Sequence, residues 1–140
     1  MVIFDEVTKI YPGDVKAVDN LSLEINRGEL VVLIGPSGCG KTTSLKMVNR
    51  LIQPSSGKIF LDGTDTDELD AVELRRQIGY VIQNIGLFPH KTVAGNIAVV
   101  PRLKKWPQED VDKRVNELLN MVSMDPKLYR NRFPNELSGG

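Results

Sequence analysis

The sequence predicts an α/β domain, and three observations support that fold class. Residues 30–34, Leu-Val-Val-Leu-Ile, form a wholly apolar run, and a second apolar strand is predicted over residues 78–82. Unbroken apolarity over a short run is typical of a strand buried on both faces of a parallel sheet. A segment with the spacing G-x-x-x-x-G-K-T follows the first run directly, and a helical pattern follows that segment. Strand, glycine-rich turn and helix in this order are the setting of a phosphate-binding loop.

Shorter strands are predicted before the first apolar run. Residues 2–7 and 21–25 read as strands, and residues 11–14 as the turn between them, because proline and glycine suit its central positions. A second turn at residues 26–29 leads into the run at 30–34. The amino-terminal part of the chain is therefore predicted to be a set of β strands that precedes the glycine-rich turn.

The helix after the glycine-rich turn is predicted over residues 41–51, with Leu45, Val48 and Ile52 on one face. A turn at residues 53–57 ends it, and a strand over residues 58–61 follows. The dipeptide Asp62-Gly63 closes that strand. Asp70 and Glu73 then have the spacing of a capping box, which predicts a short helix through Arg76.

The pattern changes to a helical one after Gln83. Pro107 begins a predicted helix, with acidic residues in its first turn and one apolar face, formed by Val111, Val115, Leu118, Leu119 and Val122. We find no internal repeat and no low-complexity segment. The sequence therefore predicts two parts: residues 1–83 with the β strands and the α/β core, and residues 84–140 as a helical segment.

Composition limits the class of protein. The 140 residues are 41% hydrophobic and 26% charged, which is ordinary for a globular domain. Lysine plus arginine equals aspartate plus glutamate at 18 each, so net charge does not favour a nucleic-acid partner. The single cysteine, Cys39, predicts a reducing compartment. The start of the chain is acidic and no apolar stretch is long enough for a bilayer, so any membrane association is expected through a partner.

The glycine-rich turn carries the chemistry. Glycines allow successive backbone N–H groups to turn inward and bind an anion, and the helix N-terminus adds its positive dipole end. Lys41 can reach the β- and γ-phosphates, and the Thr42 hydroxyl can ligate Mg²⁺. An ordinary helix start is the alternative, which the spacing disfavours. The sequence thus predicts nucleotide binding by Gly35, Pro36, Ser37, Gly38, Cys39, Gly40, Lys41 and Thr42.

The last four residues read Leu-Ser-Gly-Gly and, after a phosphate loop and Gln83, resemble the start of the LSGGQ signature of an ABC ATPase. In that family, Tyr11 matches the aromatic residue of the A-loop and Gln83 the Q-loop glutamine. A narrower resemblance is to the ATPase subunits of glycine betaine/carnitine/choline uptake systems. It is carried by residues 48–52, 79–90, 97–101 and 103–106, whereas Gly95 departs from the polar helix former more usual in those proteins.

The resemblance implies roles for further residues. Tyr11 would stack on adenine, Thr43 would reach the α-phosphate, and Gln83 would contact Mg²⁺ and water and act with Lys41 in catalysis. The simpler alternatives are a turn residue for Tyr11, a helix cap for Thr43 and a polar strand end for Gln83. In the family, the signature closes on the γ-phosphate held by the opposite subunit of a head-to-tail dimer. The resemblance gives this role to Ser138, Gly139 and Gly140. A helix cap at Ser138 is the alternative.

The implied fold is a P-loop NTPase core with amino-terminal antiparallel β strands and a helical subdomain, truncated at the signature motif. The implied function is that of the ATP-binding subunit of an importer, coupling Mg²⁺-ATP binding and hydrolysis to uptake of a small osmoprotectant such as a quaternary amine. Its partners would be transmembrane permease subunits, a second ATPase subunit and, indirectly, a substrate-binding protein, with no nucleic acid. Its location would be the cytoplasmic face of the membrane.

The main departure from the family pattern concerns hydrolysis. The Walker B aspartate, the catalytic glutamate, the D-loop and the switch histidine do not occur in the 140 residues, which are therefore expected to expose apolar edges and not to hydrolyse ATP alone. Two alternatives stay open. One is a soluble ABC ATPase of DNA repair or translation, which should show arm insertions, basic tracts or a second cassette. The other is a nucleotide-binding module without turnover.

Overall fold

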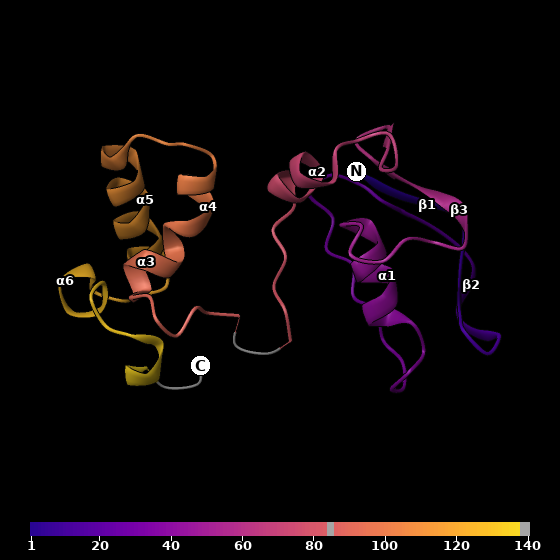
Figure 1. Ribbon diagram of the computed structural model, residues 1–140, viewed down its shortest axis with the longest axis horizontal. Helices are drawn as coiled ribbons and strands as arrows, with labels where there is room; N and C mark the ends of the chain where they lie inside the picture. The colour runs from indigo at the N-terminus through magenta and orange to yellow at the C-terminus, as the bar shows by residue number, and fades with distance from the viewer. Residues whose placement is uncertain (84–85, 138–140) are drawn as a thin grey trace. The chain divides into compact units, whose positions relative to one another are not determined.

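The computed structural model describes residues 1–83 and 86–137. It divides into two compact units, Met1–Gly79 and Tyr80–Gly140, which are described separately below (Figure 1). The domain boundary predicted between residues 83 and 84 stays a prediction. Among the described residues, no helix combines the length and the apolar character that crossing a membrane requires.

The first unit contains a four-stranded antiparallel sheet with the order β2-β1-β3-β4. Its strands are β1 (Val2–Tyr11), β2 (Val15–Ile25), β3 (Ser56–Leu61) and β4 (Thr64–Asp65). The predicted turn at residues 11–14 joins β1 to β2, and both strands extend beyond the predicted ranges as far as Tyr11 and Val15, which pair directly. Pairing with each other therefore makes both strands longer than their apolar pattern predicts.

Helix α1 (Lys41–Val48) packs on this sheet (Figure 1). The core that they share consists of buried Phe4, Val7, Val18, Met47 and Ile59. Two details of the helix prediction are wrong: α1 ends at Val48 instead of residue 51, and Leu45 is 55% exposed. Met47 and Ser44 are the buried residues of α1 instead, since the sheet meets the side of the helix on which they lie.

The predicted strands at residues 30–34 and 78–82 do not form. Neither segment is a strand, and Leu30 and Ile34 are 89% and 91% exposed. The physical reason is that no strand of the described residues pairs with either segment. A parallel strand needs neighbours that are distant in the sequence. The exposed apolar edge that we expected is present at these segments.

The end of the first unit follows its local signals. The Asp62-Gly63 turn joins β3 to β4 with positive φ at both residues, 50° and 86°, as a tight hairpin turn requires. Helix α2 (Ala71–Gln77) begins after Asp70, whose carboxylate accepts hydrogen bonds from the Val72 and Glu73 amides. The capping box is only half formed, because the Glu73 side chain pairs with Arg76.

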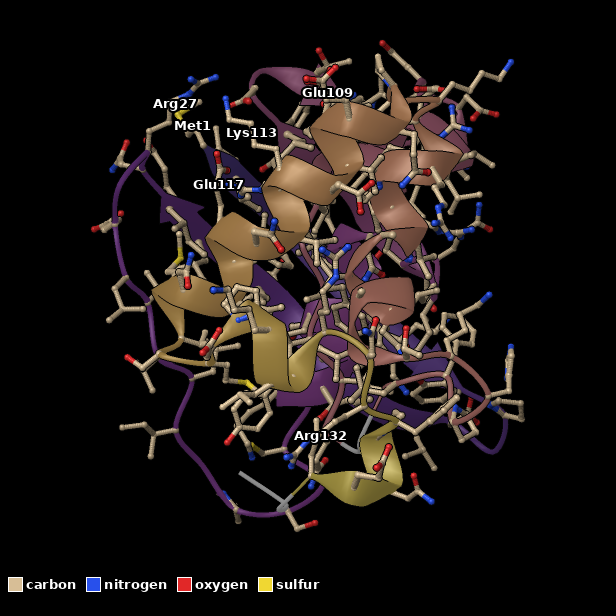
Figure 2. All side chains as sticks on the ribbon, turned by 90° about the vertical axis from the view of Figure 1, so that its left-hand side faces the viewer. Met1, Arg27, Glu109, Lys113, Glu117 and Arg132 are labelled. Carbon is tan, nitrogen blue, oxygen red and sulfur yellow. The ribbon has the colours of Figure 1, made fainter. Side chains whose placement is uncertain are left out.

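The second unit is helical. It contains α3 (Val93–Ile97), α4 (Val99–Leu103), α5 (Gln108–Met121), α6 (Pro126–Tyr129) and a short 3₁₀ turn, Pro134–Glu136. Its core comprises Val93, Ala98, Val111, Val115 and Leu119. The predicted apolar face of α5 is thus confirmed at its centre, but Val122 is 63% exposed and lies just past the helix. Figure 2 shows the polar side of α5, along which Glu109, Lys113 and Glu117 follow one another turn by turn.

Candidate nucleotide-binding site

The glycine-rich turn leads into α1 and lies against β2 at Gly40. Gly40 immediately precedes the helix with φ of 92°, a conformation that favours glycine. A Cβ atom at Gly40 would lie 2.2 Å from the Ala17 carbonyl oxygen and 3.1 Å from a methyl group of Val18. Only glycine therefore fits between the helix start and the strand. The second glycine of the motif is required both by its backbone angle and by this contact.

Lys41 lies back over the loop. Its ammonium group donates hydrogen bonds to the Gly35 carbonyl at 2.8 Å and the Pro36 carbonyl at 2.7 Å, and it lies 3.2 Å from the Cys39 sulfur. The lysine charge is thus held above the centre of the turn. Phosphate oxygens that enter the loop would replace these carbonyl oxygens as acceptors. They are better acceptors for an ammonium group because they are charged.

The start of α1 presents an uncompensated positive dipole end. No acidic residue lies in its first turn, and no side chain caps its first amides. Thr42 is exposed and Thr43 is half-buried, while the Ser44 hydroxyl donates to the Gly40 carbonyl at 3.1 Å. An anion at this helix start would meet free backbone donors and the dipole together. The loop, Lys41 and the helix start therefore offer the donors that a polyphosphate needs.

A cavity of about 550 Å³ lies beside the loop. Its walls come from β2, from the exposed apolar run, from the loop and from the start of α1: Lys16, Ala17, Val18, Asp19, Leu21, Val32, Leu33, Ile34, Gly38, Cys39, Gly40, Lys41 and Ser44. This volume lies in the range of small-molecule sites. Lys16 and Asp19 form an ion pair at 3.0 Å on its wall. The β2 wall was not expected from the sequence, because no local signal shows which strand the loop will contact.

The remaining predicted site residues are Tyr11, Gln83 and the last three residues of the chain. Tyr11 ends β1, where the Lys9 ammonium lies 5.4 Å from the centre of its ring, and it is not among the residues that line the cavity. Gln83 is exposed and belongs to the second unit. Ser138, Gly139 and Gly140 lie outside the described residues. The roles predicted for these five residues stay predictions, as do those of the loop residues 35–43.

Metal binding by protein side chains alone has little support. Across residues 1–83 and 86–137, no three histidine, cysteine, aspartate or glutamate side chains are grouped so that they could hold a metal ion. The exposed Thr42 hydroxyl at the helix start still suits Mg²⁺ that arrives with a nucleotide, because phosphate oxygens supply most ligands to such an ion.

Comparison with known proteins identifies the family. The family model described as ABC transporter matches residues 18–140, which include the loop, α1 and the whole second unit. This chain belongs to the ABC transporter family. The family resemblance in the sequence is therefore confirmed, and the glycine-rich loop lies within the matched residues.

Two relatives are similar over most or all of the chain. The glycine betaine/carnitine/choline transport ATP-binding protein OpuCA of Bacillus subtilis is 57% identical over 140 residues, which are all of this chain and 37% of that protein. The osmoprotectant import ATP-binding protein OsmV of Salmonella typhimurium is 56% identical over 125 residues, which are 89% of this chain and 33% of that protein. The chain thus spans about a third of the length of the curated relatives it matches.

A solved structure confirms the fold class. The ATP-binding cassette MJ0796, described as a dimer in a post-hydrolysis state bound to ADP and Pi, aligns with a TM-score of 0.86 and 34% identity. The match covers 99% of this chain and 64% of that one. The chain therefore has the fold of an ABC ATPase core. Its antiparallel strands and helical segment are parts of that fold.

Proposed function

We propose that this chain is the amino-terminal part of an ATPase subunit that drives import of a small osmoprotectant such as a quaternary amine. The observation that carries the proposal is the phosphate loop at the start of α1, in a chain 57% identical to a glycine betaine/carnitine/choline transport ATP-binding protein. The loop supports the nucleotide, and the relative supports the class of solute.

In this proposal Mg²⁺-ATP binds with its β- and γ-phosphates in the loop of residues 35–42. Lys41 exchanges its hydrogen bonds to the Gly35 and Pro36 carbonyls for bonds to phosphate oxygens. Thr42 contributes its hydroxyl to Mg²⁺, and the Thr43 hydroxyl reaches the α-phosphate. Tyr11 stacks on adenine, a contact worth about 0.5–1.5 kcal/mol beyond the buried area. Gln83 contacts Mg²⁺ and the attacking water.

The later steps need more than the 140 residues. Ser138, Gly139 and Gly140 act on the nucleotide of a second ATPase subunit in a head-to-tail dimer, and transmembrane permease subunits convert dimer closure into solute movement. A substrate-binding protein takes part indirectly. The subunit works at the cytoplasmic face of the membrane, held there by the permease. The 140 residues alone bind the nucleotide without turnover.

A titration tests the nucleotide step. Affinity for Mg²⁺-ATP and phosphate release are measured together for the wild type, Lys41→Ala and Lys46→Ala. We expect Lys41→Ala to weaken binding at least about tenfold, because charge-assisted hydrogen bonds to phosphate are lost. Lys46→Ala removes the same charge from the last turn of α1 and should change affinity less than about twofold. Equal affinities in all three proteins would contradict the proposed loop.

Uptake tests the transport step. The full-length protein is expressed together with transmembrane permease subunits, and entry of labelled glycine betaine, choline and an uncharged sugar is compared at high salt. We expect uptake of the quaternary amines alone, and none with Lys41→Ala. Uptake of the sugar without the amines would leave the proposed ATPase role standing and would overturn the proposed class of solute.

A further inference from the structure

The carboxyl end of α1 has an unusual residue in its turn. The Leu51 amide donates to the Lys46 carbonyl at 2.9 Å and the Arg50 amide to the Met47 carbonyl at 3.0 Å, which closes the helix in a Schellman motif. Arg50 occupies the left-handed position of this motif, with φ of 51°, where glycine is usual. A side chain in this conformation costs stability, so the contacts of Arg50 must offset the strain.

The Arg50 side chain makes these contacts with the segment before α2. Its Nη1 donates to the Leu69 carbonyl at 2.6 Å and to the Thr66 carbonyl at 3.0 Å. Its Nε lies 3.4 Å from a carboxylate oxygen of Asp67, and the side chain is only 17% exposed. The end of α1 is thereby fastened to the chain that leads into α2.

Arg75 makes the reverse connection, from α2 back to α1. Its Nε donates to the Asn49 carbonyl at 3.1 Å, and its Nη2 donates to the Arg50 carbonyl at 2.7 Å. These two carbonyls follow the last helical residue of α1, where the helix dipole is negative and the backbone acceptors lack helical partners. The planar guanidinium group bonds both carbonyls in a fixed fork geometry, which the flexible stem and point charge of a lysine do not reproduce.

The two arginines therefore join α1 and α2 in both directions. With only eight residues, α1 draws little stability from its own hydrogen bonds, and its direction depends on tertiary contacts. Those contacts include Met47 in the sheet core and the bonds of Arg50 and Arg75 at the carboxyl end. A tilt at that end would displace the opposite end, which carries Lys41 and Thr42.

We propose that Arg75 is a positioning residue for the phosphate loop, acting through α1; this inference rests on the nucleotide binding proposed above. Arg75 holds the carboxyl end of the helix, so that the amides and the lysine at the other end keep the spacing that a polyphosphate requires. The role is distinct from that of Lys41, because Arg75 bonds to the far end of the helix.

The test compares Arg75→Met with Arg76→Met on the full chain. Arg76 is the next residue of the same helix, and within residues 1–83 and 86–137 its side chain pairs only with Glu73, so its replacement removes the same charge without touching α1. We expect Arg75→Met to weaken Mg²⁺-ATP binding about tenfold, because two charge-assisted hydrogen bonds are lost. Arg76→Met should stay within about twofold of the wild type, since its ion pair is largely exposed.

Arg75→Lys separates positioning from general stability. Lysine keeps the charge but lacks the rigid fork that holds both carbonyls, so it should restore part of the affinity, to about threefold below the wild type. Thermal unfolding midpoints are measured alongside, and affinities are taken well below the lowest of them. If Arg75→Met does not fold, Arg75→Lys alone decides, and an affinity equal to the wild type overturns the inference.

The outcomes also distinguish the two proposals. A wild type that does not bind Mg²⁺-ATP overturns the proposed function and this inference with it. A wild type that binds, with Arg75 variants that bind equally well, overturns only the inference. A lower unfolding midpoint for Arg75→Met with unchanged affinity would assign Arg75 to stability and overturn the positioning role.

Discussion

The antiparallel strands of the first unit and the apolar run at residues 30–34 both read as strands, but only the former become strands. Strand β1 pairs with β2 on one side and β3 on the other, and its Phe4 and Val7 are 4% and 0% exposed. The run is more apolar than β1, yet Leu30 and Ile34 remain 89% and 91% exposed. The difference lies in where a partner comes from. Strand β1 has one partner, β2, in the next stretch of sequence, in addition to the distant β3, whereas a parallel strand has only distant partners.

Hydrogen exchange gives the largest contrast between these two regions. In the 140-residue chain, we expect the β1 amides that bond to β2 and β3 to exchange only on unfolding. Amides of residues 31–34 should exchange close to the rate of an unstructured peptide. Mass spectrometry or nuclear magnetic resonance at a single pH measures both. Protection of residues 31–34 equal to that of β1 would show that the run is paired, contrary to this comparison.

A pair of truncations gives the next largest effect. Ile59→Ala removes a side chain that is 2% exposed in the sheet core, and it should lower the free energy of unfolding by about 3 kcal/mol. Val32→Ala in the apolar run removes a side chain that is 69% exposed and should change it by less than about 0.5 kcal/mol. Urea unfolding of the 140-residue chain measures both. Equal losses would mean that the run contributes to a core.

Local signals explain how much of this fold was predictable. The turn at residues 11–14, the Asp62-Gly63 turn and the Asp70 cap are confirmed, because each depends on a few adjacent residues. The two apolar runs were predicted wrongly as strands, since strand formation also needs a partner that the pattern does not specify. Helix α1 was predicted too long for a similar reason. It ends where the Arg50 turn meets the segment before α2, a contact between residues far apart in sequence.

The candidate site divides in the same way. The glycine-rich loop and the helix that starts at Lys41 were predictable because their spacing is a local signal, and phosphate binding by them stays a prediction. Its packing on Ala17 and the bonds from Arg75 to the end of α1 were not, since both come from other elements. Arginine is common in short helices, and nothing in the residue spacing distinguishes Arg75 from its neighbour Arg76 as the one that bonds to α1. The motif specifies the loop residues themselves, and the rest of the fold supplies the contacts that hold them in place.

The cap of α2 tests a locally determined element. Asp70→Ala removes the acceptor for the Val72 and Glu73 amides and should cost about 1 kcal/mol of stability. Glu73→Ala should cost less, because the Glu73 side chain forms an exposed pair with Arg76 and does not complete the capping box. Urea unfolding at constant ionic strength measures both. A larger loss from Glu73→Ala than from Asp70→Ala would contradict the half-formed box.

The pH dependence of the β3–β4 hairpin gives the smallest effect. The Lys58 ammonium donates to Asp65 at 2.8 Å, and the Asp67 amide donates to the same carboxylate at 3.0 Å. The Lys58 hydrogen bond, followed by the Asp67 amide, lowers the pKa of Asp65 below its ordinary value. Because the folded pKa is the lower one, charged Asp65 stabilises the protein above the unfolded value of about 3.9. That contribution is lost as the pH falls through the folded pKa.

We therefore expect Asp65→Asn to unfold more easily than the wild type at pH 7, with the difference shrinking below about pH 4. The effect should be small and should weaken with added salt, because Lys58 is 61% exposed and the ion pair is screened. Asp14→Asn makes the same chemical change on the exposed hairpin turn and serves as the control. Urea unfolding at pH 7, 5 and 3 measures the difference. If that difference grew as the pH fell, the stabilising partner of Asp65 would have to be a group other than Lys58, because protonation of the carboxylate can only weaken a bond to an ammonium group.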